Sequence, residues 1–457
     1  MQEEPGLNRV VVFIVVAISL LMTTVDTTIV ATALDTLQKE LHATVNWIGW
    51  VMTAYSFGFV LMLPLSAKLG DIYGSRRIFI GSISLFTMAS LGCGFTHQIE
   101  SLIVLRVVQA IGAAGITPSV TAIIVDHFGS ARDRAVSLFG SIFPIGVMIG
   151  PIFGGLIVTY WSWPWIFFVN VPLGLLVILM SFIFIPKDTF TKQARSKMDI
   201  TGLIWMGLGI LSAMFAVAYL GEEETSIGSP FFLLLLLLSS ICFGCFIRHI
   251  NRVSKPFIAP LFVYGKGFGQ VNFLNLLYTG MTQGVIALVP LYAANLYGLN
   301  AMDASVLLIS QGIASVFLST LVTLLLRRTG YRPPLYVGSV LVILGTILLA
   351  FDPVFSITPY YWMMGATFLI GCGMGTISPP ARNAGLQLAP KESATIAALR
   401  SLCIQLGAII SIAIATAIIA SSSHPGETQS YIYLGVAVFF ALMIPVIRGV
   451  PEHKGSW

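Results

Sequence analysis

Two ionisable residues stand inside long apolar segments, where ionisable residues are rare. Asp26 lies in the run LLMTTVDTTIVATAL, and Arg106 lies in the run LIVLRVVQAIGAAG. A carboxylate at membrane depth is costly unless it is protonated, paired or hydrated, and an arginine needs an anion, backbone carbonyls or water. Asp26 is the one acid of the sequence that falls deep in an apolar segment. We therefore expect it to be the electrostatic partner of Arg106, directly or through water.

A buried carboxylate beside a buried cation suits proton coupling. Burial and a charged partner set how readily the carboxylate takes a proton, which lets a membrane protein link proton movement to a change of shape. Two plainer interpretations stay open at this point. Asp26 could merely satisfy neighbouring hydroxyls such as those of Thr23 or Thr27. Arg106 could be a structural anchor that binds backbone carbonyls.

A glycine-rich run marks a close helix contact. The run GVMIGPIFGG contains Gly146, Gly150, Pro151, Gly154 and Gly155. Small residues at every third or fourth position form a groove for a neighbouring helix, and a proline removes one backbone hydrogen bond and bends the helix. The combination predicts tight packing of this segment and is more specific than small-residue spacing alone.

A short polar loop separates the second and third apolar segments. It contains Asp71, Gly74, Arg76 and Arg77. We expect Gly74 to form the turn, and Asp71 to bind a helix terminus or a basic loop such as 132–134. The alternative is ordinary loop charge that sets the orientation of the chain in the membrane.

Polar and aromatic residues recur at helical spacing in two segments, at positions 46, 50, 53 and 57 and at positions 272, 275, 279 and 283. Positions 272, 275, 279 and 283 fall on one face of a regular helix. Such residues line a cavity or form hydrogen bonds between helices. For the predicted helix at 46–67, packing against neighbouring helices explains the pattern equally well. The candidates for a substrate cavity are Trp50, Thr53, Gln109, Asn272, Asn275, Thr279 and Gln283.

The composition requires membrane-spanning elements to position these residues. Of 457 residues 56% are hydrophobic and 9% are charged, the net charge is +5 and the mean hydropathy is +0.91. So few charges exclude a water-soluble body, the high apolar fraction excludes disorder, and nothing suggests nucleic acid. Windows long enough to cross a bilayer predict fourteen helices, near 10–34, 46–67, 78–96, 101–124, 136–159, 165–186, 200–220, 231–248, 269–297, 304–326, 335–352, 359–380, 394–421 and 430–448.

Basic residues set the expected orientation. All 24 lysines and arginines except Lys39, Arg106 and Arg400 fall in the two tails or in alternate loops that share one side with the N-terminus. By the positive-inside rule both termini are expected in the cytoplasm.

The motifs together resemble the major facilitator superfamily, and within it the fourteen-helix drug–proton antiporter branch. The loop at 71–77 resembles the superfamily's loop motif, and Arg106 and Gln109 belong to a run that resembles its fourth-helix proton-coupling motif. The glycine run at 146–155 resembles the fifth-helix antiporter motif. The Asp26 segment resembles the first-helix motif, and residues 161–174 resemble the sixth-helix entry.

The resemblance implies an all-α membrane protein with a central cavity that opens alternately to each side. It implies a six-helix bundle at 1–186, two inserted helices with flanking loops at 187–267, and a second six-helix bundle at 268–457. The implied function is proton-coupled export of diverse lipophilic drugs or dyes from the cytoplasm, in a bacterial-type inner (cytoplasmic) membrane. Asp26 is the expected protonation site, and no cofactor or metal is expected.

Other functions remain open from the sequence. The chain could be a dedicated exporter of a lipid, siderophore or metabolite, or a drug antiporter driven by sodium, because a carboxylate near hydroxyls also suits a small hard cation. An enzyme is not expected, because the six histidines are scattered and form no cluster with other metal ligands. We expect a monomer whose partners are its small-molecule substrates and the lipid bilayer.

Overall fold

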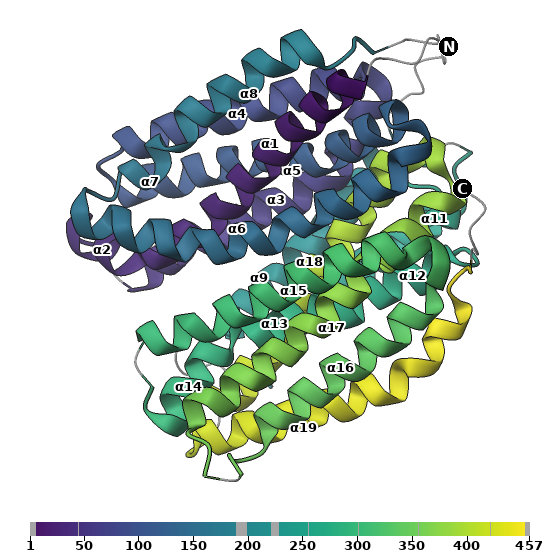
Figure 1. Ribbon diagram of the computed structural model, residues 1–457. Helices are drawn as coiled ribbons and strands as arrows, with labels where there is room; N and C mark the ends of the chain where they lie inside the picture. Colours follow the sequence, from purple (N-terminus) through teal and green to yellow (C-terminus); the bar gives the residue numbers. More distant parts are fainter. Residues whose placement is uncertain are drawn as a thin grey trace. The chain divides into compact units, whose positions relative to one another are not determined.

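The computed structural model describes residues 6–43, 45–188, 199–220, 228–254, 256–299, 301–354, 356–420 and 422–452, and within them the regular structure is all helical. The chain divides into two compact units (Figure 1). One holds the chain before Asp199 together with Pro390–Ala398, and the other holds Asp199–Ala389 and the chain from Leu399 onward. The boundaries predicted at 186 and 267 stay predictions.

The first unit is built from the helices that carry most of the motif residues. Its elements are α1 (Gly6–Thr32), α2 (Leu34–Glu40), α3 (Val45–Tyr73), α4 (Ser75–Phe95), α5 (Ile99–His127), η1 (Gly129–Ala131), α6 (Arg132–Tyr160), α7 (Trp165–Phe168) and α8 (Asn170–Phe184). Within this unit α1 packs against α6 and α8, and α5 packs against α3 and α4. These contacts bring the first, third, fourth and sixth spans around one point.

The second unit contains the remaining long helices. Its elements are α9 (Ile200–Leu220), α10 (Pro230–Ile250), α11 (Pro260–Tyr264), α12 (Phe268–Leu274), η2 (Asn275–Met281), α13 (Thr282–Ala287), α14 (Val289–Tyr297), α15 (Ala301–Thr329), α16 (Arg332–Ala350), α17 (Pro359–Leu388), α18 (Ser393–Ala420), which begins in the first unit, α19 (Pro425–Met443) and η4 (Ile444–Gly449), with η3 (Pro390–Glu392) assigned to the first unit. Helices α15 and α16 both pack against α17, and α9 packs against α10.

The helices are long and apolar enough for a protein that crosses the membrane many times. Among the described residues 11 helices meet the requirement for a span, or up to 12 if the bent pair Phe268–Ala287 and Val289–Tyr297 is one span. Every one of the fourteen predicted windows contains helix. Two of them fall short of the requirement: the apolar part of α9, Ile200–Ala216, is shorter, and α17 carries Gly, Pro, Arg and Asn residues in its second half.

The predicted span at 269–297 is not one regular helix. Its middle, η2, is a π-helix, and the segment bends by 40° between α13 and α14. Pro290 lies in the first turn of α14, where its missing amide hydrogen interrupts the backbone ladder. A π-helix has more residues per turn than an α-helix, so the regular α-helix assumed for positions 272, 275, 279 and 283 is interrupted at Asn275–Met281. That these four residues share one face stays a prediction.

Each unit uses an acid near the end of its chain segment to hold the start of one long helix, α4 in the first unit and α16 in the second. In the first unit Asp188, after α8, accepts hydrogen bonds from the backbone amides of Arg76 (3.1 Å) and Arg77 (3.4 Å) at the start of α4. In the second, Glu452, after η4, accepts bonds from the amides of Tyr331 (2.6 Å) and Arg332 (3.1 Å) at the start of α16. Each acid satisfies orphan amides and carries the charge that a helix N-terminus favours.

Candidate functional site

The centre of the site is a direct ion pair between Asp26 on α1 and Arg106 on α5. The Nη1 atom of Arg106 lies 2.6 Å from Oδ2 of Asp26, and both side chains are fully buried. Neither helix can be rotated about its axis without moving one charge away from the other. The contact expected from the sequence is therefore present, and it needs no bridging water.

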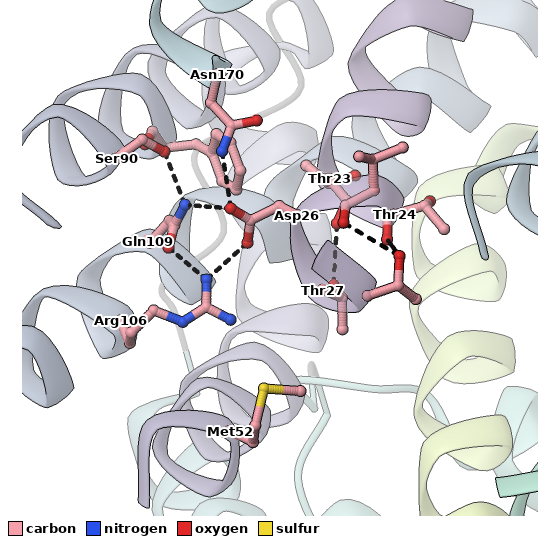
Figure 2. Close-up of polar contacts among 12 residues, drawn as sticks. Thr23, Thr24, Asp26, Thr27, Met52, Ser90, Arg106, Gln109 and Asn170 are labelled. Carbon is pink, nitrogen blue, oxygen red and sulfur yellow. Dashed lines mark hydrogen bonds and ion pairs between the residues drawn. The ribbon is translucent and has the colours of Figure 1, made fainter. Parts of the chain in front are cut away.

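Two amides complete the surroundings of the carboxylate (Figure 2). The Oδ1 atom of Asp26 accepts hydrogen bonds from Gln109 Nε2 at 2.9 Å and from Asn170 Nδ2 at 2.8 Å. Gln109 also accepts a bond from Arg106 Nη1 at 2.6 Å and donates to Ser90 Oγ at 2.7 Å. Gln109, a candidate for the substrate cavity, thus bridges the acid and the base.

Sequence reasoning missed Ser90 and Asn170. Ser90 on α4 is fully buried and Asn170 on α8 is 2% exposed. The available signal was a polar residue in an apolar run, WIFFVNVPLGLLVIL for Asn170. Nothing in that run says that its amide reaches a carboxylate 144 residues earlier in the chain.

Aromatic rings cover the guanidinium of Arg106. The ring centroid of Tyr55 lies 4.1 Å from its Cζ atom and that of Phe167 lies 5.8 Å away. Its Nε and Nη2 atoms are buried without a hydrogen-bond partner. The cation therefore depends on one carboxylate, one amide oxygen and the ring faces, whose negative potential attracts it.

The two plainer interpretations of the pair do not fit this geometry. The hydroxyl of Thr23 donates to the carbonyls of Ser19 and Leu20, and that of Thr27 donates to the carbonyl of Thr23, all on their own helix. The hydrogen bonds of Arg106 go to side chains, those of Asp26 and Gln109. The polar demand of the carboxylate is thus met by the guanidinium and amides.

The glycine run on α6 packs against the helix that carries Asp26. A β-carbon at Gly146 would overlap Thr24, one at Gly150 would overlap Thr28, and one at Gly154 would overlap Thr32. Gly155 differs, because it faces open space. Pro151 lies within the same uninterrupted helix. The predicted groove therefore accepts α1, through three glycines spaced four residues apart.

The predicted loop at 71–77 is mostly helical, because α3 ends at Tyr73 and α4 begins at Ser75, so the turn consists of Gly74. Gly74 has a φ of +96°, and a β-carbon there would overlap Asp188. Arg76 extends along the end of α8, where its Nη2 donates to the carbonyl of Phe182 at 2.8 Å, and Arg77 is exposed. Asp71 is exposed as well. An acid that binds a helix terminus here is Asp188. The expected contact of Asp71 with a helix terminus or with the basic loop at 132–134 stays a prediction.

The remaining cavity candidates have separate surroundings. Trp50 packs edge-on against Phe57 at 5.9 Å between ring centroids, and Thr53 is half-buried on the same helix.

The four polar residues near η2 differ among themselves. Asn272 donates to the carbonyls of Phe262 and Val263 on α11, and Asn275 is fully buried and donates to Val271 on its own helix. Thr279 is buried and Gln283 is half-buried. Asn272 therefore serves a helix contact, and Asn275 Oδ1 and Thr279 Oγ1 are buried without a hydrogen-bond partner in the described part of the chain.

The family follows from a match along the chain. The model of the Major Facilitator Superfamily matches residues 16–412 and 271–456. The chain belongs to the major facilitator superfamily. Its fold is likewise that of a solved superfamily member, the proton:xylose symporter XylE, with a TM-score of 0.67 at 15% identity over 97% of this chain and 96% of that chain.

Relatives of this superfamily member are named as transporters of different cargo. The putative multidrug resistance protein MdtD of Pectobacterium atrosepticum is 27% identical over 456 residues, covering 96% of this chain and 95% of the relative. The riboflavin transporter RibZ of Clostridioides difficile is 25% identical over 432 residues, covering 92% of each chain. The superfamily and its fold are those of multi-span membrane transporters.

Histidine, cysteine and acidic side chains do not assemble into a metal site in the part of the chain that the structure describes. No group of three or more such residues lies close enough to hold an ion.

Proposed function

We propose that this transporter exports lipophilic drug-like molecules from the cytoplasm in exchange for protons. The observation that carries the proposal is the buried carboxylate of Asp26 on α1, which faces one guanidinium and two amide donors from α5 and α8. Intramembrane acids of this kind mark proton relays in transporters. The near full-length relative named as a multidrug resistance protein supports drug-like cargo.

In the proposed cycle Asp26 takes a proton when the protein opens outward and releases it when the protein opens inward. Protonation removes the negative charge that faces Arg106, and the guanidinium, which keeps its charge, must then find another partner. One unit charge moving across 100 mV is worth about 2.3 kcal/mol, so inward proton flow can drive an uphill export step. Cargo and proton compete through the same rearrangement and need not touch the same atoms.

The close fit of α6 on α1 supports the same coupling. Gly146, Gly150 and Gly154 leave no space between the two backbones for a displaced threonine. A change at Asp26 that shifts α1 must therefore move α6 with it, because packed helices are not continuously deformable.

The proposed topology has fourteen spans, which include α9, whose apolar part is shorter, and α17, which carries polar residues in its second half. Both termini lie in the cytoplasm, and the protein works as a monomer in the cytoplasmic membrane by alternating access at a cavity near the midplane. Trp50, Thr53, Asn275, Thr279 and Gln283 are the proposed cavity residues.

Proton coupling is preferred to sodium coupling on the contacts of the carboxylate. Among the residues that the structure describes, the hydrogen bonds to Asp26 come from N–H donors, whereas a sodium ion requires free oxygen ligands. The nearby threonine hydroxyls bond backbone carbonyls of α1.

Dye transport in inverted membrane vesicles tests the proposal. Proton and sodium gradients are imposed separately, and the accumulation of ethidium is followed. We expect accumulation with the proton gradient only, loss of gradient-driven uptake for Asp26→Asn, partial activity for Asp26→Glu, and loss for Arg106→Gln. Full proton-driven uptake by Asp26→Asn would overturn the coupling role.

A dedicated exporter of one metabolite is the second candidate. The observation in its favour is the riboflavin transporter among the relatives, which covers 92% of this chain. A panel of cationic dyes, riboflavin and other planar metabolites in the same vesicles separates the two candidates, because a dedicated exporter ignores most of the panel.

A further inference from the structure

Asn170 lies at the start of α8, where this helix meets α1 and α4 of the first unit. It is the first residue of α8, directly after the short helix α7, and it is 2% exposed. Its amide reaches Asp26 on α1, and one turn later Gly174 packs so closely on Thr87 of α4 that a β-carbon would overlap the threonine. The start of α8 is therefore fixed between α1 and α4, with its polar atom on the carboxylate.

The hydrogen bonds around Asp26 match an ionised carboxylate. Oδ2 accepts from Arg106, and Oδ1 accepts from both Gln109 and Asn170. A carboxylate is acceptor-only, whereas a protonated carboxyl group carries one O–H donor that needs an acceptor. Protonation on Oδ1 would direct an O–H toward two amide donors, so one of those amides must turn away.

Asn170 is the amide that is free to turn away. Gln109 is held at both ends, since its Oε1 accepts from Arg106 and its Nε2 also donates to Ser90. The Ser90 hydroxyl is held in turn, because it donates to the carbonyl of Phe86. The Nδ2 atom of Asn170 has Asp26 as the side-chain partner that positions it.

The other ionisable groups that act on Asp26 come from three helices. Among the described residues they are Arg106 on α5, Tyr55 on α3 and Cys93 on α4. A phenol and a thiol are ordinarily uncharged at neutral pH, so Arg106 is the one full charge of the three. Helix α8 contributes a neutral amide, which acts through its hydrogen bond.

We propose that Asn170 is a positioning residue that ties protonation of Asp26 to the packing of α8 on α1. The proposal rests on the proposed proton coupling at Asp26 and adds the element that responds to it. When Asp26 is ionised, Asn170 holds the start of α8 against α1. When Asp26 takes a proton, that bond is lost and the α7–α8 corner, with Phe167 beside Arg106, is released.

The first test is the pH profile of ethidium uptake in inverted vesicles, at a proton gradient of constant size. Asn170→Ala removes a donor to a charged group, so protonation becomes easier and the pH of half-maximal uptake rises by about one unit. Asn170→Asp places a second carboxyl group beside Asp26 and shifts the midpoint further upward. Asn170→Ser restores a donor of shorter reach and gives an intermediate shift.

The matched control is Ser181→Ala on the same helix. Ser181 is fully buried, and its hydroxyl donates to the carbonyl of Val177 within α8. Ser181→Ala changes the packing of α8 without touching the carboxylate of Asp26, so we expect the pH of half-maximal uptake to stay unchanged. An unchanged midpoint for Asn170→Ala in protein that folds and transports would overturn the proposal.

A second readout does not depend on transport. The unfolding temperature of the purified protein is measured against pH for wild type, Asn170→Ala and Ser181→Ala. The hydrogen bond from Asn170 stabilises the ionised carboxylate of Asp26, so its contribution to stability is lost as pH falls. We therefore expect the difference in unfolding temperature between wild type and Asn170→Ala to narrow at low pH. The difference in unfolding temperature between wild type and Ser181→Ala should not change with pH.

The two readouts separate the two ideas. In one outcome, the difference in unfolding temperature between wild type and Asn170→Ala narrows at low pH, but Asp26→Asn still shows proton-driven uptake. That outcome contradicts the coupling role of Asp26 and supports the hydrogen-bond role of Asn170. A constant difference for Asn170→Ala contradicts the role of Asn170 even where uptake depends on Asp26.

Discussion

Gly150 on α6 lies directly against Thr28 on α1, so closely that a β-carbon on the glycine would overlap the threonine side chain. Thr28 Oγ1 also lies 3.4 Å from the carbonyl oxygen of Gly146, one turn earlier on α6. Asp26 is two residues from Thr28 on the same helix. The glycine run of α6 therefore packs on one face of α1, and Asp26 lies on another face of the same helix.

Replacing Gly150 tests this close contact against a neighbour on the same helix. Gly150→Ala must push α1 away from α6, at a cost of roughly 1–3 kcal/mol, and we expect a lower unfolding temperature and weaker dye uptake. Gly155→Ala meets open space and gains helix propensity, so it should be neutral or slightly stabilising. Equal effects of the two substitutions would contradict the packing argument.

The two members of the ion pair should differ in what their loss costs. Asp26→Asn leaves a buried guanidinium without its anion, and we expect a loss of about 3–5 kcal/mol in unfolding free energy. Arg106→Gln leaves a carboxylate that can be neutralised by a proton, whereas a guanidinium cannot readily lose one, so its cost should be smaller and should shrink at low pH. Unfolding measurements from neutral to acid pH check this asymmetry, and the double variant should recover part of the loss.

The acid after α8 should stabilise the start of α4. Asp188→Ala removes the acceptor for the amides of Arg76 and Arg77, and we expect a loss of about 1 kcal/mol, as for other helix caps. The exposed neighbour Lys187 provides the control, because Lys187→Ala changes the charge of the same loop without removing the cap. Thermal unfolding in detergent measures both. A similar loss for Glu452→Ala would show that the second unit uses the same device.

A pH effect is expected at the join between α9 and α10. Burial alone would raise the pKa of Asp199, but hydrogen bonds from the amide of Gly202 (2.9 Å), from His249 Nε2 (2.7 Å) and from the amide of Phe257 (3.0 Å) outweigh burial and lower it. A lowered carboxyl pKa gives stability that is present above the ordinary value of about 4 and is lost as pH falls through the lower folded value.

The measurement compares wild type with Asp199→Asn. The difference in unfolding temperature should be full above about pH 5 and should fall as the pH drops below about 4. A difference that stays constant across that range would show that the carboxylate charge contributes nothing at this join.

The site residues that could be predicted from the sequence are those whose type is unusual in the segment that surrounds them. Asp26 and Arg106 stand out because each residue is improbable in its own apolar surroundings, whatever its neighbours in space. Gly150 stands out for the same local reason, as part of a small-residue pattern. The polar stripe at 272–283 was predicted for a regular α-helix, and neither hydropathy nor residue spacing predicted the π-helix at Asn275–Met281.

A bundle of apolar helices, one acid and one base deep within it, and one closely packed helix could all be predicted from the amino-acid sequence. Hydropathy and residue size are properties of each segment alone, so the order of residues is enough to predict them. The packing of α1 in the glycine groove and the contact of Asn170 with Asp26, 144 residues apart in the chain, became known from the folded structure. Those contacts depend on how each helix is rotated about its axis and where it bends, which the packing of all the helices decides together.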